Sequence, residues 1–228
     1  MTLNSLTRNE LDELTRNINS FKEYVDSYCE KQNIQLSQSA KSFLRFWAKR
    51  IIFMNYLKEC DYNQWIDGIV SDMFFFSASV ILDQKRYMYL NLRSFIESFI
   101  KLLLNVKVEN EQITRKSFEQ FRSLYKKDIL NDDEFSIIKN VYKVSCMAIH
   151  NPLFKENDLA IGIKDCLENK IYNVNHNDRN TVETEVFNNV QTITSIFIRL
   201  LIYKYREQID STFYRRKIIM NRLIGNTK

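Results

Sequence analysis

Residues 92–101 read Leu92-Arg93-Ser94-Phe95-Ile96-Glu97-Ser98-Phe99-Ile100-Lys101, and residues 142–152 read Tyr142-Lys143-Val144-Ser145-Cys146-Met147-Ala148-Ile149-His150-Asn151-Pro152. Apolar residues recur in both stretches at the spacing of a helix. In the first stretch, Arg93, Glu97 and Lys101 are each four residues apart, which places them on one helix face. Charges inside an apolar helix are costly unless they are paired. We therefore expect the rest of the chain to be organised around these two helices.

The composition favours long helices joined by short connections. The 228 residues include only 3 glycines and 1 proline, which sheets and tight turns require. Hydrophobic residues make up 45% of the chain, enough to bury a sizeable core. We predict an all-α fold, a helical bundle of roughly seven to nine helices in one domain. Within it, we expect an N-terminal helical pair over residues 1–60, a central bundle over 63–207 and a basic C-terminal helix over 208–228.

Helical periodicity and capping signals predict where the helices lie. The expected ranges are about 8–31, 37–60, 64–80, 87–106, 114–127, 131–150, 159–172, 181–204 and 212–223. Thr7 and Glu10 have the spacing of a capping box, and Asn63, Asn131 and Asn180 are expected N-caps. Pro152 ends the helix that carries His150, because the residue before a proline disfavours helical backbone.

Three features of these helices leave alternatives open or make a specific prediction. The first helix has a narrow apolar stripe, so it either lies on the body of the domain or pairs with another chain. Residues 83–86 form either a turn or an exposed ridge on one long helix. Phe74, Phe75 and Phe76 make the third helix apolar nearly all round, which predicts a central, buried helix.

Several classes of protein are disfavoured by the sequence. The four cysteines are far apart, which predicts reduced packing thiols and no zinc site. The N-terminus is polar, unlike a signal peptide, and no apolar run approaches the roughly 20 residues that span a bilayer. We therefore expect a cytoplasmic protein that makes no membrane contact and needs no metal or cofactor. The net charge of +5 is compatible with binding to nucleic acid.

The charged seam and the histidine each have two interpretations. Arg93, Glu97 and Lys101 form either a solvated ladder of ion pairs or a polar seam that faces another helix or a cleft. His150 either stabilises the end of its helix through the helix dipole or acts as a general acid and base. His176 lies in an Asn-rich stretch and is expected at the surface. Basic residues near 45–50 and 206–222 would form a phosphate-binding patch only if they converge beside His150.

The two stretches together resemble HEPN-like proteins of the abortive-infection kind, which are all-α domains of prokaryotic antiphage and toxin systems. The first stretch has the form LR-x-x-x-E-x-x-x-K, and the second has the form Y-x-x-S-x-x-x-x-H-N. The resemblance covers about residues 68–206. The matching residues are Arg93, Glu97, Lys101, Tyr142, Ser145, His150 and Asn151.

The resemblance implies a metal-independent endoribonuclease whose two copies converge on RNA in a homodimer. Catalytic members use an arginine, four to six further residues and a histidine. The corresponding window before His150 holds Lys143, Val144 and Ser145 and lacks an arginine. The cation would then be Lys143 or Arg93 from the neighbouring helix, although lysine does not replace arginine at a phosphate fork.

Two functions follow as expectations. In the first, the chain belongs to an antiviral-defence or toxin–antitoxin system and cleaves RNA, with His150 as general acid and base and with Arg93, oriented by Glu97, or Lys143 stabilising the charge on the phosphate. Lys101, Tyr142, Ser145 and Asn151 would bind the substrate. In the second, the chain is a non-catalytic helical module that binds a partner effector or an antitoxin through the polar seam.

Overall fold

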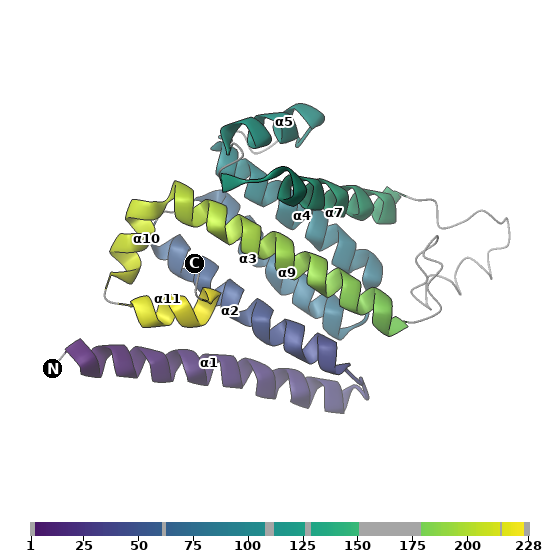
Figure 1. The fold of residues 1–228 in the computed structure, drawn as a ribbon. Helices are drawn as coiled ribbons and strands as arrows, with labels where there is room; N and C mark the ends of the chain where they lie inside the picture. Colours follow the sequence, from purple (N-terminus) through teal and green to yellow (C-terminus); the bar gives the residue numbers. More distant parts are fainter. Residues whose placement is uncertain are drawn as a thin grey trace, which may run out of the picture.

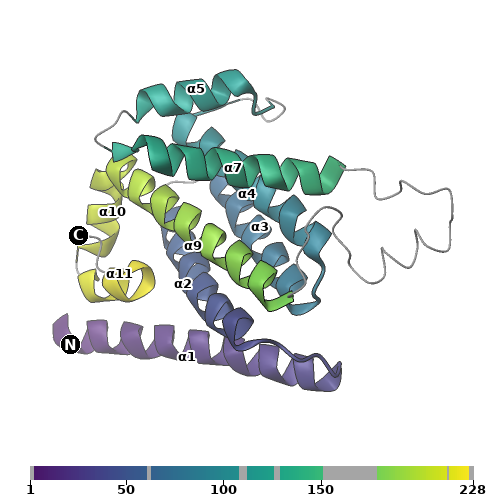
Figure 2. The same cartoon turned by 45° about the vertical axis from the view of Figure 1, so that its right-hand side comes forward.

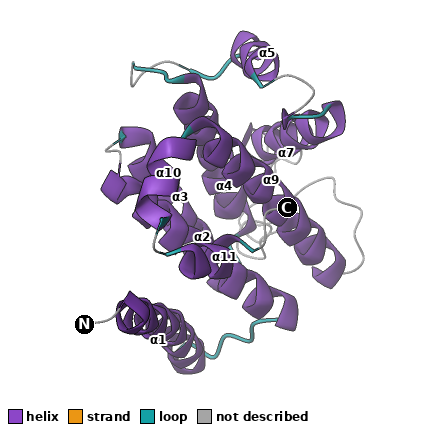
Figure 3. Cartoon of the chain, turned by 60° about the vertical axis from the view of Figure 1, so that its left-hand side comes forward, coloured by secondary structure: helices purple, strands orange, loops and turns teal. Residues whose placement is uncertain are grey.

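The computed structural model describes residues 3–60, 63–107, 112–125, 129–150, 179–214 and 216–225. Within these ranges the chain forms nine helices and no strand (Figure 3), which confirms the all-α class. The helices are α1 (Leu3–Lys31), α2 (Gln38–Cys60), α3 (Gln64–Ile81), α4 (Lys85–Leu104), α5 (Arg115–Leu124), α7 (Asp132–His150), α9 (Arg179–Lys204), α10 (Arg206–Phe213) and α11 (Lys217–Ile224).

The helix α4 lies at the centre of the arrangement. It contacts α3, α7, α9 and α5, while α2 packs against α3, α9 and the two C-terminal helices (Figure 1). Two helices lie at opposite edges of the bundle: α1 beside α2, and α5 beyond α7 (Figure 2). The first helix therefore rests on the body of the domain, which is one of its two predicted positions.

Aromatic side chains fill the space between α2, α3, α4 and α9. The rings of Phe99 and Phe197 stack with their centroids 4.6 Å apart, and the ring of Phe95 lies 5.4 Å from that of Trp47. The indole N–H of Trp47 donates to the carbonyl of Met73 at 2.8 Å, so the one polar atom of this side chain is satisfied. Aromatic pairs of this kind stabilise a core beyond the area that they bury.

Two of the predicted capping residues, Asn63 and Asn131, are confirmed. The side chain of Asn63 accepts a hydrogen bond from the backbone N–H of Trp65 at the start of α3. At the start of α7, Asn131 and Glu134 bond each other's backbone N–H groups. Between α3 and α4 the chain makes a turn, where Asp83 adopts a left-handed backbone with φ of 52°. The alternative of one continuous helix through residues 83–86 is therefore wrong.

Other predicted helix boundaries differ from the structure. The first helix begins at Leu3 instead of near Arg8. Its Glu10 forms an ion pair with Arg216 at 2.7 Å and so serves tertiary packing instead of a capping box. Asn180 lies inside α9, which begins at Arg179, so it is not the N-cap. The C-terminal segment forms two helices, α10 and α11, and the helix predicted over 159–172 lies outside the described residues.

One side of the third helix lies at the surface, whereas the sequence predicted a central, buried helix. Phe76 faces the core and is 1% exposed, but Phe74 is 51% exposed and Phe75 is 62% exposed. Three consecutive residues point in directions about 100° apart around a helix, so they cannot all face one core. No helix in the described part of the chain is both long enough and apolar enough to cross a membrane.

Two of the predicted basic residues, Arg50 and Arg216, serve packing. Arg50 on α2 is buried, donates a hydrogen bond to the carbonyl of Leu223, and lies 4.5 Å from the ring centroid of Phe46. Burial lowers the pKa of Arg50 to about 10. Arg216, just before α11, is bound to Glu10 of α1. Arg50 and Arg216 therefore both hold the C-terminal segment against the N-terminal helix pair. They do not join a phosphate-binding patch beside α7.

Candidate functional site

The two stretches singled out in the sequence lie side by side as α4 and α7. The helices run antiparallel, because Glu97 contacts Tyr142 while Arg86 contacts Ile149. A single carboxylate oxygen of Glu97 accepts two hydrogen bonds. One comes from the guanidinium of Arg93 at 2.9 Å, and the other comes from the hydroxyl of Tyr142 at 2.7 Å. The guanidinium carbon of Arg93 also lies 5.9 Å from the ring centroid of Tyr142. We call Arg93, Glu97 and Tyr142 the α4–α7 triad.

The triad is neither a fully solvated ladder nor a sealed core pair. The side chains of Arg93 and Glu97 are 29% and 24% exposed, so the pair faces a neighbouring helix and also reaches the surface. The hydrogen bond to Glu97 raises the pKa of Arg93, which stays a cation. Burial and the hydrogen bond to Glu97 raise the pKa of Tyr142, so its hydroxyl remains a donor. The geometry thus holds one positive group in a fixed orientation.

A residue that the sequence reasoning missed lies beside the triad. Asp72 on α3 has one carboxyl oxygen that is buried and has no hydrogen-bond partner. Desolvation raises the pKa of Asp72 to about 6; the charge of Glu97 adds to this effect, and a hydrogen bond from Ser94 opposes it. The signal for this residue was in the sequence, since Asp72 is an acid within an apolar helix, like Glu97 in α4.

Lys101 lies one helical turn beyond Glu97 and makes a different contact. Its ammonium nitrogen is 4.6 Å from the ring centroid of Trp65 on α3. The indole N–H of Trp65 donates to the carbonyl of Val106 at 2.7 Å, which fixes the ring. Lys101 therefore extends the polar seam toward α3 and is not part of the triad.

Two residues predicted on α7 are placed away from the triad. Ser145 is fully buried, and its hydroxyl donates to the carbonyl of Val141 at 2.8 Å, so it is enclosed by the helix packing. Lys143 is exposed. It follows Tyr142 directly, and neighbouring residues point about 100° apart around a helix. Lys143 thus projects from a different side of α7 than Tyr142.

The end of α7 has an arginine beside it that the sequence reasoning did not select. The helix ends at His150, whose side chain lies outside the described residues, as do Asn151 and His176. Arg86 of α4 donates a hydrogen bond to the carbonyl of Ile149 at 3.2 Å. Arg86 and Arg93 are two turns apart on α4, which is about 10 Å along the helix axis. Of these two arginines, Arg86 is therefore the one that lies beside the end of α7.

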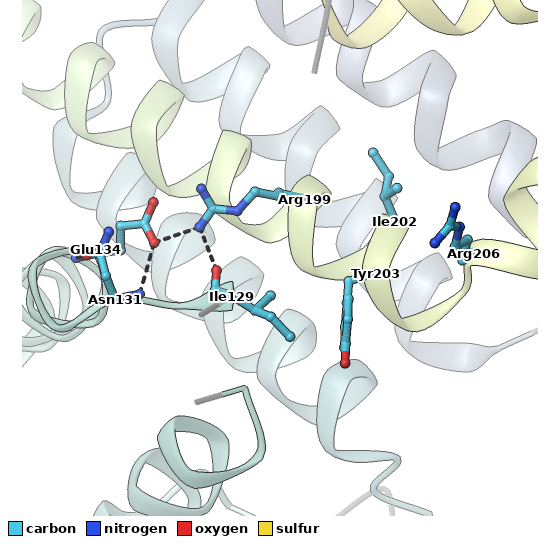
Figure 4. Close-up of a pocket in the computed structure, with 7 residues that line it drawn as sticks. All are labelled: Ile129, Asn131, Glu134, Arg199, Ile202, Tyr203 and Arg206. Carbon is cyan, nitrogen blue, oxygen red and sulfur yellow. Dashed lines mark hydrogen bonds and ion pairs between the residues drawn. The ribbon is translucent and has the colours of Figure 1, made fainter. Parts of the chain in front are cut away.

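A separate groove of about 520 Å³ lies between the start of α7 and the end of α9 (Figure 4). Arg199 donates to the carbonyl of Ile129 at 2.9 Å and to Glu134 at 2.6 Å. The hydrogen bond from Arg199 lowers the pKa of Glu134, which therefore stays ionised. The groove is lined by Ile129, Asn131, Glu134, Arg199, Ile202, Tyr203 and Arg206.

Within the described ranges, no group of three or more His, Cys, Asp or Glu side chains could hold a metal ion. Comparisons with protein-family models, with curated proteins and with solved structures gave no match. The fold and the α4–α7 triad are thus the observations from which a function is argued.

Proposed function

We propose that the chain is a HEPN-like component of a prokaryotic defence or toxin system and that it acts on RNA through the α4–α7 seam. The observation that carries the proposal is the triad. Arg93 is held by Glu97, Glu97 is held by Tyr142 from the other helix, and the group reaches the surface. A guanidinium held in this way is suited to bind a phosphate group, because little freedom is lost when the anion arrives.

The reaction that fits such a site is metal-independent cleavage of RNA. The 2′-hydroxyl of the substrate attacks the adjacent phosphorus, and the bond to the 5′-oxygen of the next nucleotide breaks. In the proposal, His150 takes and returns the proton, and an arginine stabilises the negative charge that develops on the phosphate oxygens. Arg86 is a second candidate for this role, since it contacts the last turn of α7, which His150 ends.

The test is cleavage of labelled RNA by the purified full-length chain in the presence of EDTA. We expect the wild type to cleave the RNA and His150→Ala to cleave it about a hundred-fold or more slowly. The alanine variant of whichever arginine stabilises the phosphate charge should lose the same factor in rate. Arg93→Ala and Arg86→Ala therefore distinguish the two guanidinium groups. Arg115→Ala is the matched control, because Arg115 and Glu119 form the same four-residue ion pair on an exposed face of α5.

The cleavage proposal is wrong if the wild type leaves RNA intact, or if all four variants cleave as the wild type does. Expression in cells gives an independent measurement. The proposal expects the wild type to slow growth and His150→Ala to relieve this effect.

A second candidate function is a non-catalytic interaction module, and exposed apolar side chains favour it. Phe75 lies one turn from Asp72 on α3, and Leu90 lies one turn from Arg93 on α4. They are 62% and 44% exposed. Exposed aromatic residues, other apolar residues and arginine are typical of protein interfaces.

The interaction module is tested by measuring the mass of the full-length chain by light scattering. If Phe75 and Leu90 mediate self-association, the wild type forms a homodimer, and Phe75→Ser with Leu90→Ser should halve the mass. Leu124→Ser is the control, since Leu124 is 58% exposed on α5. A monomeric wild type, or a dimer that survives the double substitution, contradicts self-association through this surface.

A further inference from the structure

The groove between α7 and α9 has a fixed wall. Arg199 binds both the Ile129 carbonyl and Glu134, and Glu134 also accepts a hydrogen bond from the backbone N–H of Asn131 at 3.2 Å. These contacts join the capping box of α7 to the last turns of α9. The wall is therefore present before any ligand binds, which lowers the entropic cost of binding.

A tyrosine lies in the middle of this groove. Tyr203 is 60% exposed, and its ring lies 6.5 Å from that of Tyr125, which meets it edge to face. Figure 4 shows Tyr203 between Arg199 on one side and Arg206 on the other, with Ile129 and Ile202 nearby. An exposed aromatic face with apolar neighbours is a surface on which another flat ring can stack.

The second arginine is available to an anion. Arg206 begins α10, where the chain bends after Tyr205, and its side chain is 81% exposed. It lies 3.7 Å from Asp210, whose side chain is 71% exposed. An ion pair so exposed contributes little to stability, so a phosphate group can displace the carboxylate. Arg199, in contrast, is neutralised by Glu134 and serves as part of the wall.

We infer that this groove is a nucleotide-binding site in which the base stacks on Tyr203 and the phosphate pairs with Arg206. The shared chemistry is a flat base that carries a phosphate group, from either a free nucleotide or one unit of a single-stranded RNA. The volume of about 520 Å³ falls within the usual range for a small-ligand site. The inference does not depend on the α4–α7 triad and goes beyond the proposed function.

The experiment measures binding to the full-length chain of three probes: adenosine, AMP and a fluorescein-labelled oligoadenylate of about twelve nucleotides, the length range of single-strand binding sites. Tyr203→Ala should weaken all three by about ten-fold or more, and Tyr203→Phe should not, because it keeps the ring. Arg206→Ala should weaken AMP and the oligonucleotide but not adenosine. Arg206→Ala should also lower the slope of the oligonucleotide's log binding constant against log salt concentration by about 1, as expected for the loss of one phosphate contact.

Tyr24→Ala is the matched control, since Tyr24 is 72% exposed on α1. Tighter binding of the oligonucleotide than of AMP identifies an RNA strand as the ligand, and the reverse identifies a free nucleotide. The inference is overturned if none of the probes binds the wild type, or if Tyr203→Ala and Tyr24→Ala bind them equally. Failure of the proposed function is seen separately, as unchanged cleavage in the Arg93, Arg86 and His150 variants.

Discussion

The two faces of α4 contact their neighbouring helices through different kinds of side chain. One face places Phe95 and Phe99 against Trp47 and Phe197, with ring centroids 4.6–6.2 Å apart. The other face places Arg93 and Glu97 beside α7, where hydrogen bonds replace apolar contact. The aromatic face fixes the position of the helix, because its rings are fully enclosed. The polar face can then keep groups partly exposed and partly desolvated, as binding sites often do.

The largest effect is expected on the aromatic face. Phe197→Ala should lower the free energy of unfolding by about 3–5 kcal/mol, because it leaves a cavity between α4 and α9. Phe74→Ala is the matched control: Phe74 is 51% exposed, and its loss should change the free energy of unfolding by about 0.5 kcal/mol or less. Urea unfolding followed by circular dichroism measures both. Equal losses would show that the aromatic face does not hold the bundle together.

The next largest effect is expected on the polar side, where Asp72 should make the free energy of unfolding depend on pH. The pKa of Asp72 is raised to about 6 in the folded chain, so the folded state binds a proton more readily than the unfolded state. Stability from this residue is therefore present at low pH and is lost as pH rises through about 6. Asp72→Asn should be more stable than the wild type at pH 8 by about 3 kcal/mol, and the difference should vanish near pH 4.

Urea unfolding at pH 4, 6 and 8 measures this dependence, and Asp83→Asn on the turn after α3 is the control. A constant difference between the wild type and Asp72→Asn at all three pH values would contradict a buried carboxylate. The expected sign is opposite to that of an acid held in an ion pair, such as Glu134, whose pKa is lowered.

The sequence predicted the fold class, the helix pair and the residues of the triad. Local signals were sufficient for these, because Asn63 and Asn131 act on their own helix ends. The spacing of Arg93 and Glu97 likewise needs only one helix. Tyr142 was selected from the sequence as a substrate-binding residue, and its hydrogen bond to Glu97 was not predicted.

Other features depend on contacts between distant segments, which periodicity cannot reveal. Glu10 looked like part of a capping box, but it pairs with Arg216 more than two hundred residues away. Arg86 lies in the first turn of α4, and only its hydrogen bond to the carbonyl of Ile149 shows that it lies beside the end of α7. Phe75 has the composition of a core residue, yet the side of α3 that bears it meets no other described helix closely enough to bury it. The roles of His150 and Asn151 stay predictions.

A smaller effect is expected from breaking the triad itself. Glu97→Gln replaces a charged acceptor of two hydrogen bonds by a neutral one, which should cost about 1 kcal/mol of unfolding free energy near pH 5. At pH 8 Asp72 is ionised, and Glu97→Gln removes the negative charge that repels it. The cost of the substitution should therefore be smaller at pH 8 than near pH 5. Glu119→Gln on α5, which removes the exposed partner of Arg115, should change the free energy of unfolding by less than about 0.5 kcal/mol. If Glu97→Gln and Glu119→Gln lower the free energy of unfolding equally, the triad contributes no more than an exposed ion pair.

The smallest effect tests how far the polar face extends toward α3. Lys101→Met keeps most of the side chain but removes the cation above Trp65, which should cost about 0.5–1 kcal/mol. Lys101→Arg should keep the interaction and the stability. Trp47 is buried in the aromatic core, so a change in tryptophan emission in Lys101→Met would come from Trp65. Loss of stability without any change in emission would mean that Lys101 acts through the helix dipole of α4, and the polar face would then end at Glu97.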